Sequence, residues 1–301
     1  MSEFRRVVKV GGREFNLSAK VGNSAQSNSY IGTTAPAAGQ TEPQHIFLKV
    51  SKSVEFNATI DREVVPYAGE GAFSARLETP AFTALRQRAV PKLITKLSLR
   101  DGRRGFILES HACAVSIETI IKKFPQGINA FSAMWMFRRM VSSLMYIHSR
   151  NYAHGAVTPD NCIVIMDPPS CRAYYEGAHS GFVADWKHVK ESESEFPAAP
   201  TSWSSIYSPG ERISCSHDVY MLARTISKLL GKDDPHDLEL HESAARLKGV
   251  LSACVLGRTA RLKTAFNVWH ELDAVIKAVR QETGITFVPS TLDGLDANPG
   301  L

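Results

Sequence analysis

The strongest structural signal in the chain is a long amphipathic helix that is followed at once by a polar loop and a short apolar strand. Residues 129–148 place apolar side chains at steps of three and four, and Asn129 stands in the position of an N-cap. The loop over residues 152–161 reads Tyr-Ala-His-Gly-Ala-Val-Thr-Pro-Asp-Asn, and the apolar residues 162–164 follow it. This unit is where we expect the chemistry of the chain to be concentrated.

The segments on either side of this unit differ in character. Before it, short apolar runs between turn signals indicate strands, among them residues 45–50 and 106–108, with one helix expected over residues 77–86. After it, residues 218–230 and 266–279 carry helical patterns. The order of these elements predicts an α+β fold.

The length of the chain indicates two lobes. Its 301 residues exceed the roughly 250–300 residues that a single hydrophobic core fills. We expect a small β-rich amino-terminal lobe over residues 1–109 and a larger helical lobe over residues 110–283. A polar tail over residues 284–301 completes the chain.

The composition excludes several classes of protein. Hydrophobic residues make up 44% of the chain and charged residues 22%, which is typical of an ordered globular domain. The net charge of +5 comes without a basic run, so nucleic acid is not the expected partner. No apolar run approaches the roughly 18 residues of a membrane span. Five scattered cysteines predict reduced thiols in the cytoplasm or nucleus, and no metal site.

The loop resembles the catalytic loop of the protein kinases, whose pattern is H-R-D-x-K-P-x-N followed by a short strand. His154, Pro159 and Asn161 fall at the matching places. Further motifs follow in the family's order over residues 15–280. The resemblance therefore implies a bilobal kinase-like fold.

The resemblance also implies roles for residues outside the loop. Lys49 stands where kinases keep the strand lysine that holds the nucleotide phosphates, and Asp185 ends an apolar strand like the metal-binding D-F-G aspartate. Asp218 matches the aspartate that anchors the backbone of the catalytic loop. Glu211, in a segment like A-P-E with one inserted residue, would pair with Arg261.

The glutamate that pairs with Lys49 in kinases is less clearly placed. Glu78 fits the rhythm of a helix followed by a strand, and Glu63 and Glu55 remain alternatives. The vestigial nucleotide site implied by the resemblance consists of Gly22, Lys49, Glu78, Asn161 and Asp185, of which Asn161 and Asp185 are the remnants of a metal site.

Departures from the kinase pattern fall on the chemistry. Ala156 replaces the catalytic aspartate and Thr158 replaces the lysine of the loop, so neither a proton acceptor nor a cation stands there. Trp186 and Lys187 replace the Phe and Gly of D-F-G, and Lys187 is placed to form an ion pair with Asp185.

The glycine-rich loop is eroded as well. It keeps Gly22, while Ser24 and Ser27 stand where the pattern has glycine. We therefore expect no certain cofactor, with weak binding of ATP and Mg²⁺ without turnover as an open alternative.

These features predict a pseudokinase, which is not an enzyme but a protein-binding scaffold. The Phe-Pro-Gln-Gly of residues 124–127 and the loop at His154 resemble the Bub-type mitotic-checkpoint kinases, including the divergent kinetochore pseudokinase of kinetoplastids. That resemblance implies kinetochore or checkpoint partners and a nuclear, kinetochore location, or otherwise a cytoplasmic one. The alternatives are an unconventional kinase or nucleotidyl transferase that uses Asp160, and an ATP-binding switch, including a rhoptry-type pseudokinase.

Two segments are expected to be additions to the minimal fold, exposed and free to bind a partner. They are residues 51–76 and residues 167–181. The second segment contains Tyr174 and Tyr175, which are candidates for partner binding because tyrosine is favoured at interface hot spots.

Overall fold

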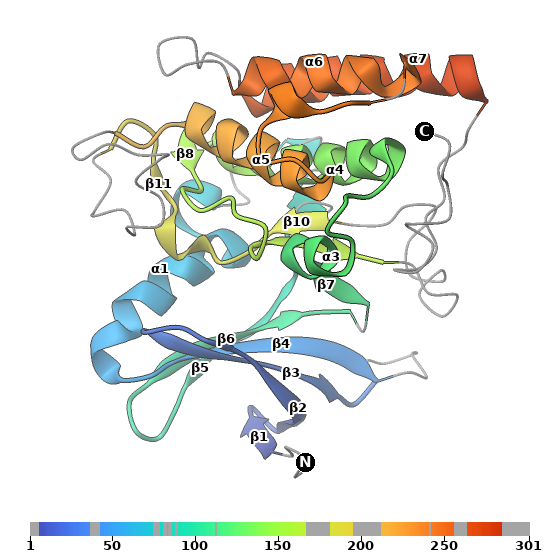
Figure 1. Cartoon of the computed structure of the whole chain (residues 1–301). Helices are drawn as coiled ribbons and strands as arrows, with labels where there is room; N and C mark the ends of the chain where they lie inside the picture. The colour runs from blue at the N-terminus through green and yellow to red at the C-terminus, as the bar shows by residue number, and fades with distance from the viewer. Residues whose placement is uncertain are drawn as a thin grey trace. The chain divides into compact units, whose positions relative to one another are not determined.

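The computed structural model describes residues 6–36, 43–74, 79–80, 83, 86–87, 90–111, 113–166, 181–194, 212–240, 242–255 and 264–284. The chain divides into two compact units, Met1–Thr83 with Val90–Ala114, and Ala84–Ala89 with Val115–Leu301 (Figure 1). The main change of unit comes after Ala114, compared with residue 109 in the sequence-based prediction. The predicted α+β class, a β-rich unit followed by a helical one, is confirmed.

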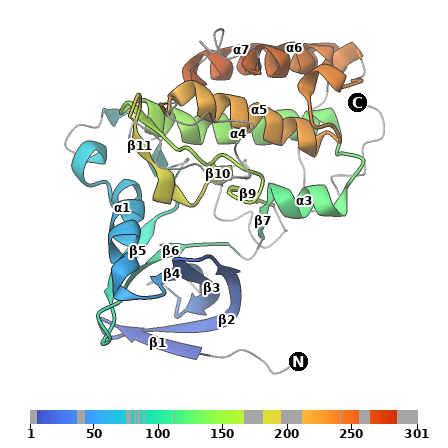
Figure 2. The ribbon, with the colours of Figure 1, turned by 60° about the vertical axis from the view of Figure 1, so that its left-hand side comes forward.

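The amino-terminal unit is built on one antiparallel sheet of six strands in the order β1-β2-β3-β4-β6-β5 (Figure 2). The strands are β1 (Arg6–Val10), β2 (Arg13–Asn23), β3 (Ser27–Thr34), β4 (Gln44–Ser51), β5 (Leu93–Ser98) and β6 (Arg104–Glu109). The two strands expected at residues 45–50 and 106–108 are β4 and β6.

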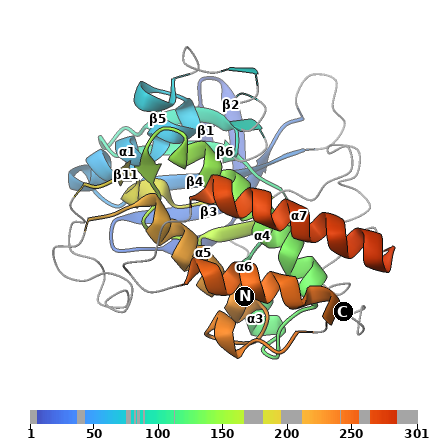
Figure 3. The same cartoon turned by 90° about the horizontal axis from the view of Figure 1, so that it is seen from above.

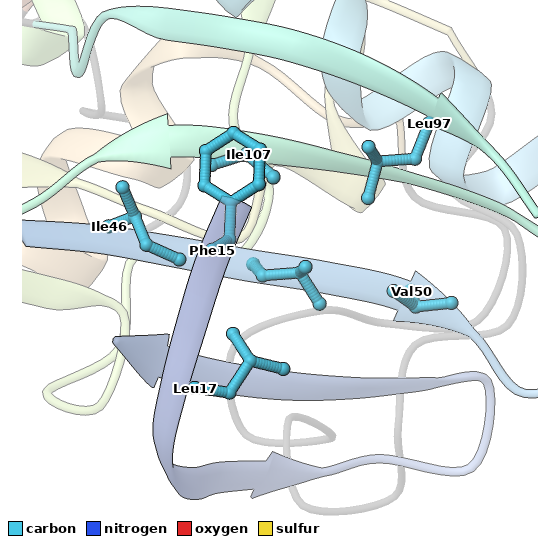
Figure 4. Packing of buried hydrophobic residues seen from close by; sticks show 7 residues of the cluster. Phe15, Leu17, Ile46, Val50, Leu97 and Ile107 are labelled. Carbon is cyan, nitrogen blue, oxygen red and sulfur yellow. The ribbon is translucent and has the colours of Figure 1, made fainter. Parts of the chain in front are cut away.

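One face of this sheet forms the hydrophobic core of the unit. Side chains alternate between the two faces along a strand, so every second residue of β4 points into this core. The core consists of Phe15, Leu17, Ile46, Leu48, Val50, Leu97 and Ile107 (Figure 4). Lys49 lies between two of these residues in sequence and is therefore on the opposite face of the sheet.

Helix α1 (Asn57–Ala68) packs against β4, β5 and β6. It follows a 3-10 turn over Val54–Phe56 and precedes another over Gly71–Phe73. Its buried side chains recur at helical spacing, with Ile60, Glu63, Val64 and Tyr67 among them. The interpretation of residues 51–76 as an added surface insertion is therefore wrong, because the middle of this segment is a helix that packs on the sheet. The helix expected over residues 77–86 lies largely outside the described residues.

The carboxy-terminal unit is mainly helical. Its helices are α3 (Ile117–Lys123), α4 (Ala130–His148), α5 (Cys215–Leu229), α6 (Ala245–Cys254) and α7 (Ala265–Thr283), and 3-10 turns lie at Trp186–His188, Pro235–Asp237 and Glu242–Ala244. Its strands are β8 (Tyr152–Ala153), β9 (Cys162–Ile165), β10 (Gly181–Val183) and β11 (Lys190–Glu191), and β7 (Ala114–Ser116) spans the boundary between the units. Strands β10, β9 and β7 form one sheet, and β11 pairs with β8.

Helix α4 is the centre of this unit. It packs against α5, α7 and β10, and Figure 3 shows α7 crossing it. The Asn129 side chain accepts a hydrogen bond from the backbone N–H of Ser132 at 2.8 Å, so the predicted N-cap and the predicted helix are confirmed. None of the described helices is long and apolar enough to cross a membrane.

Two glycines let the loop before α4 pass directly against the end of α5. Gly127 has φ +95° and Gly231 has φ +85°. A Cβ atom on Gly127 would lie 2.4 Å from the carbonyl carbon of Leu230, and one on Gly231 would lie 2.4 Å from the carbonyl oxygen of Gln126. The Pro-Gln-Gly motif thus has a structural role, because only glycine fits at its last position.

We expect Gly127→Ala to lower the free energy of unfolding by about 2 kcal/mol or more, because it combines a left-handed backbone with a backbone clash. Gly249→Ala in α6 is the matched control, since its Cβ would meet nothing within 4 Å. That control should raise the free energy of unfolding by about 0.5–1 kcal/mol. Urea denaturation measures both changes, and equal stability of the two variants would contradict the close approach.

Candidate functional site

The amino-terminal unit contains a buried ion pair. The Nζ atom of Lys49 in β4 lies 2.8 Å from Oε1 and 2.8 Å from Oε2 of Glu63 in α1. The two side chains are 7% and 2% exposed, so the pair is almost fully removed from water. Glu63, one of the two alternatives, is therefore the observed partner of Lys49. Glu78, the residue that the sequence pattern favoured, lies outside the described residues.

Local structure explains why the pair forms. Lys49 is on the face of the sheet that α1 covers, and Glu63 lies on the buried side of that helix. One turn further along the helix, Tyr67 packs its ring against Phe106 of β6, with the ring centroids 5.7 Å apart. The packing of the aromatic rings holds α1 at the distance from the sheet at which the two charged side chains meet.

The carboxy-terminal unit holds the loop after α4 through one carboxylate. Asp218 of α5 is fully buried and accepts a hydrogen bond from the backbone N–H of His154 at 2.6 Å and from that of Gly155 at 2.8 Å. The Nε2 atom of His148, the last residue of α4, lies 3.0 Å from the same carboxylate. Asp218 therefore lies where the resemblance implied, and it fixes the backbone of the loop.

The ring of His154 is neutral and has a defined tautomer. Its Nδ1 accepts the backbone N–H of Ala156 at 3.2 Å, so the proton is on Nε2, which donates to the carbonyl of Ala184 at 3.0 Å. Burial lowers the pKa of His154 below its ordinary value of 6.5, although the nearby Asp218 and Asp185 act to raise it. His154 is therefore a structural link between the loop and the strand that leads to Asp185.

A buried methyl group stands at the position where the resemblance to kinases implies an aspartate. Ala156 is 0% exposed, and its carbonyl accepts a hydrogen bond from Nδ2 of Asn161 at 3.0 Å. The hydroxyl of Thr158 donates to Oδ1 of Asp160 at 2.5 Å. These bonds lie within the loop itself. Asp160, the acidic residue of the loop, accepts the hydroxyl of Thr158, two residues before it.

Asp185 has an unusual backbone conformation and forms an ion pair with Lys187. It has φ +61° and ψ +62°, a left-handed conformation that is uncommon outside glycine and clusters at functional sites. Its Oδ2 lies 2.7 Å from Nζ of Lys187, so the ion pair expected from the sequence is present. Among the described residues, no group of three or more His, Cys, Asp or Glu side chains is arranged to hold a metal ion.

Trp186 is part of the core of this unit. Its side chain is 0% exposed, and its indole N–H donates to the carbonyl of Val183. The ring lies 6.0 Å from that of Tyr146 and 6.0 Å from that of His154, centroid to centroid. The indole therefore serves as packing beneath the loop.

Gly22 lies in β2 opposite Ser29 of β3. A Cβ atom at Gly22 would lie 3.1 Å from the Cβ of Ser29, so the serine side chain already covers this glycine.

Phe47, which the sequence analysis does not single out, lies two residues before Lys49 on the same face of β4. It pairs with Ile31 and Leu108 on the neighbouring strands and stands where the kinase strand pattern V-A-I-K has alanine.

Several predicted residues lie outside the described part of the chain. They are Glu78, Tyr174, Tyr175, Glu211 and Arg261. The expected pair of Glu211 and Arg261 and the expected role of the two tyrosines therefore stay predictions.

We expect Lys49→Ala to lower the free energy of unfolding by about 3–5 kcal/mol, because it leaves the buried carboxylate of Glu63 without its cation. Lys96→Ala is the matched control. Lys96 pairs with Glu70 at 2.6 Å, but their side chains are 45% and 53% exposed, and exposed pairs contribute about 1 kcal/mol or less. Denaturation of both variants measures the difference, and similar losses would mean that the pair with Glu63 is not a buried anchor.

The lowered pKa of His154 gives a dependence of stability on pH. Below about pH 6.5 the unfolded chain binds a proton at this residue that the folded protein does not, so the free energy of unfolding falls with the pH, by up to about 1.4 kcal/mol per pH unit. His154→Gln should reduce this slope between pH 7.5 and the pKa of the folded protein. His111, whose pKa burial also lowers, is the second contributor, and His111→Gln measures its share. An unchanged slope in His154→Gln would contradict the neutral ring.

No protein-family model matches the chain, and no curated protein matches its sequence. Solved structures do match it. The BubR1 kinase domain aligns with a TM-score of 0.63 and 13% identity, over 92% of this chain and 86% of that one. Vaccinia related kinase 3 aligns with a TM-score of 0.60 and 16% identity, over 96% and 94% of the two chains.

The PknI kinase domain of Mycobacterium tuberculosis aligns with a TM-score of 0.52 and 18% identity, over 89% of this chain and 98% of that one. All three structures are kinase domains, and all are similar over most of their length. At these identities the likeness concerns architecture. The chain has the protein-kinase fold.

Proposed function

We propose that this protein is a pseudokinase, a kinase-like domain that transfers no phosphate and acts by binding other proteins. The observation that carries the proposal is the buried methyl of Ala156 in a loop that otherwise keeps its kinase-like bonds. The backbone anchor at Asp218 and the Asn161 contact are in place, so the loop is folded. What is missing is the group that would accept or orient a proton.

The chemical loss is large. A positioned general base contributes typically ~10²–10⁴-fold to a rate, and a cation or donor aimed at developing charge contributes ~10²–10³-fold. The loop has Ala156 where the general base would stand and Thr158 where the cation would stand. Asp160, the acidic group on which an unconventional enzyme would depend, already accepts the Thr158 hydroxyl.

The residues present do not fit a kinase metal site. The ammonium of Lys187 lies 2.7 Å from Oδ2 of Asp185 and so takes one of the two oxygen atoms that a divalent cation would use. A cation that binds there would also meet the positive charge of that ammonium. This argues against the ATP-binding switch, in which Mg²⁺ and nucleotide would bind without turnover.

A scaffold at the kinetochore, and hence a nuclear location, is the more specific form of the proposal. Its support is the likeness to the BubR1 kinase domain and the Pro-Gln-Gly motif that ends at Gly127. Protein partners, with kinetochore or checkpoint components as candidates, would be recognised by exposed segments of the fold. Tyr174 and Tyr175 are the candidate contacts.

Phosphate transfer is the direct test of inactivity. We expect the purified chain to transfer no labelled phosphate from Mg²⁺-ATP to itself or to generic substrates above the level of Asp185→Ala, with an active kinase as the positive control. Ala156→Asp alone should stay silent, because Thr158 and the Lys187–Asp185 pair remain. Transfer by the wild type that disappears in Asp185→Ala would overturn the proposal.

Localisation of the tagged protein in dividing cells tests the scaffold. The double variant Tyr174→Ala, Tyr175→Ala should lose kinetochore localisation while keeping the melting temperature of the wild type. Asp185→Asn should keep the localisation and lose at most the contribution of its partly exposed pair with Lys187 to stability. It is preferable to Lys49→Ala, which removes the cation of a buried ion pair and destabilises the protein whatever it binds. If a folded Asp185→Asn protein delocalises and the tyrosine variant does not, the surroundings of Asp185 are the functional site.

A further inference from the structure

The turn between β2 and β3 is closed by one of its own side chains. The Oγ atom of Ser24 accepts the backbone N–H of Ser27 at 3.0 Å and that of Gln26 at 3.3 Å. The same hydroxyl lies 3.3 Å from the carbonyl oxygen of Ser27 and 3.0 Å from its Oγ. The backbone N–H of Ser24 donates to the carbonyl of Ser27 at 3.0 Å.

These bonds use the whole hydrogen-bonding capacity of the Ser24 hydroxyl. A serine hydroxyl has two acceptor lone pairs and one proton. Here the two N–H groups take the lone pairs, and the proton goes to Ser27. The hydroxyl therefore has no capacity left for a ligand, and the two N–H groups are occupied as well.

This is the opposite of what a phosphate-binding turn requires. Such turns hold their backbone N–H groups unpaired and directed at the anion, which supplies the acceptor oxygens. In this turn the acceptor is a side chain of the protein. The oxygen of Ser24 thus takes the N–H groups that a phosphate oxygen would otherwise take.

Contacts on both sides hold the turn in this form. Ser27 is 4% exposed, so its pairing with Ser24 is shielded from water. The backbone N–H of Lys52, just after β4, donates to the carbonyl of Gln26 at 2.9 Å. Next to the turn, the side chain of Ser29 covers Gly22. The turn is therefore hydrogen-bonded to the residue that follows β4, the strand that carries Lys49.

We propose that Ser24 is a built-in substitute for phosphate, which keeps the β2–β3 turn closed without nucleotide and leaves it no free donors for one. This inference rests on the proposed function, since a self-closed turn suits a domain whose working state has no nucleotide. It assigns Ser24 a role that the glycine-rich pattern alone does not indicate, because that pattern predicts only a weakened phosphate loop.

Amide exchange of the full chain, read by NMR, tests the substitute directly. In the wild type the amides of Gln26 and Ser27 should be protected, and neither should shift when millimolar tripolyphosphate is added. Ser24→Ala should speed their exchange about tenfold, the factor expected for the loss of a hydrogen bond, and should make both amides respond to tripolyphosphate. Ser24→Thr, which restores the hydroxyl, should restore protection.

Ser18→Ala is the matched control, because Ser18 is also a serine of β2 and its hydroxyl makes a bond of 3.3 Å to the carbonyl of Ile31. It should leave the two turn amides unchanged. Unprotected amides in the wild type, a wild-type shift with tripolyphosphate, or no effect of Ser24→Ala would each overturn the proposal. A protected turn in a chain that transfers phosphate would contradict the proposed function alone, so the two failures are distinguishable.

Discussion

The carboxy-terminal unit depends on the buried carboxylate of Asp218. A charge removed from water is costly unless hydrogen bonds replace its hydration. Asp218 obtains these from the backbone N–H groups of His154 and Gly155 and from the ring of His148. Because these donors come from the end of α4 and from the loop, one side chain of α5 joins α5 to both of them.

His154 connects Asp218 to the backbone next to Asp185. Once the backbone of His154 is fixed, its neutral ring reaches the carbonyl of Ala184 and packs against Trp186. The residue between these two is Asp185, which takes up its left-handed conformation under constraints from both sides. None of these bonds involves the side chain of Ala156, so the fold of the loop does not depend on the side chain at this position.

The parts predicted well from the sequence are those that local physics decides. The three- and four-residue periodicity and the Asn129 cap predict α4, and the observed helix runs over Ala130–His148. The pairing of Lys49 is different, because a buried partner is chosen by how α1 packs on the sheet. The sequence pattern favours Glu78 and leaves Glu63 and Glu55 open, and the observed contact of Lys49 with Glu63 depends on α1 packing against β4 and β6. Helix α1 is not predicted from the sequence, because residues 51–76 are interpreted there as an insertion.

Two sets of polar groups at the candidate functional residues are satisfied by side chains of the protein itself. Groups that serve a ligand in the free state are left unsatisfied until the ligand arrives, and such groups cost stability. In this chain Lys187 balances Asp185, and Ser24 satisfies the N–H groups of its turn. Each of these contacts lowers the free energy of the unit in which it lies, because it satisfies a group that would otherwise be left without a partner. The two contacts thus act locally, one at the end of β10 and one at the β2–β3 turn, and each makes its own segment stable without any bound ligand.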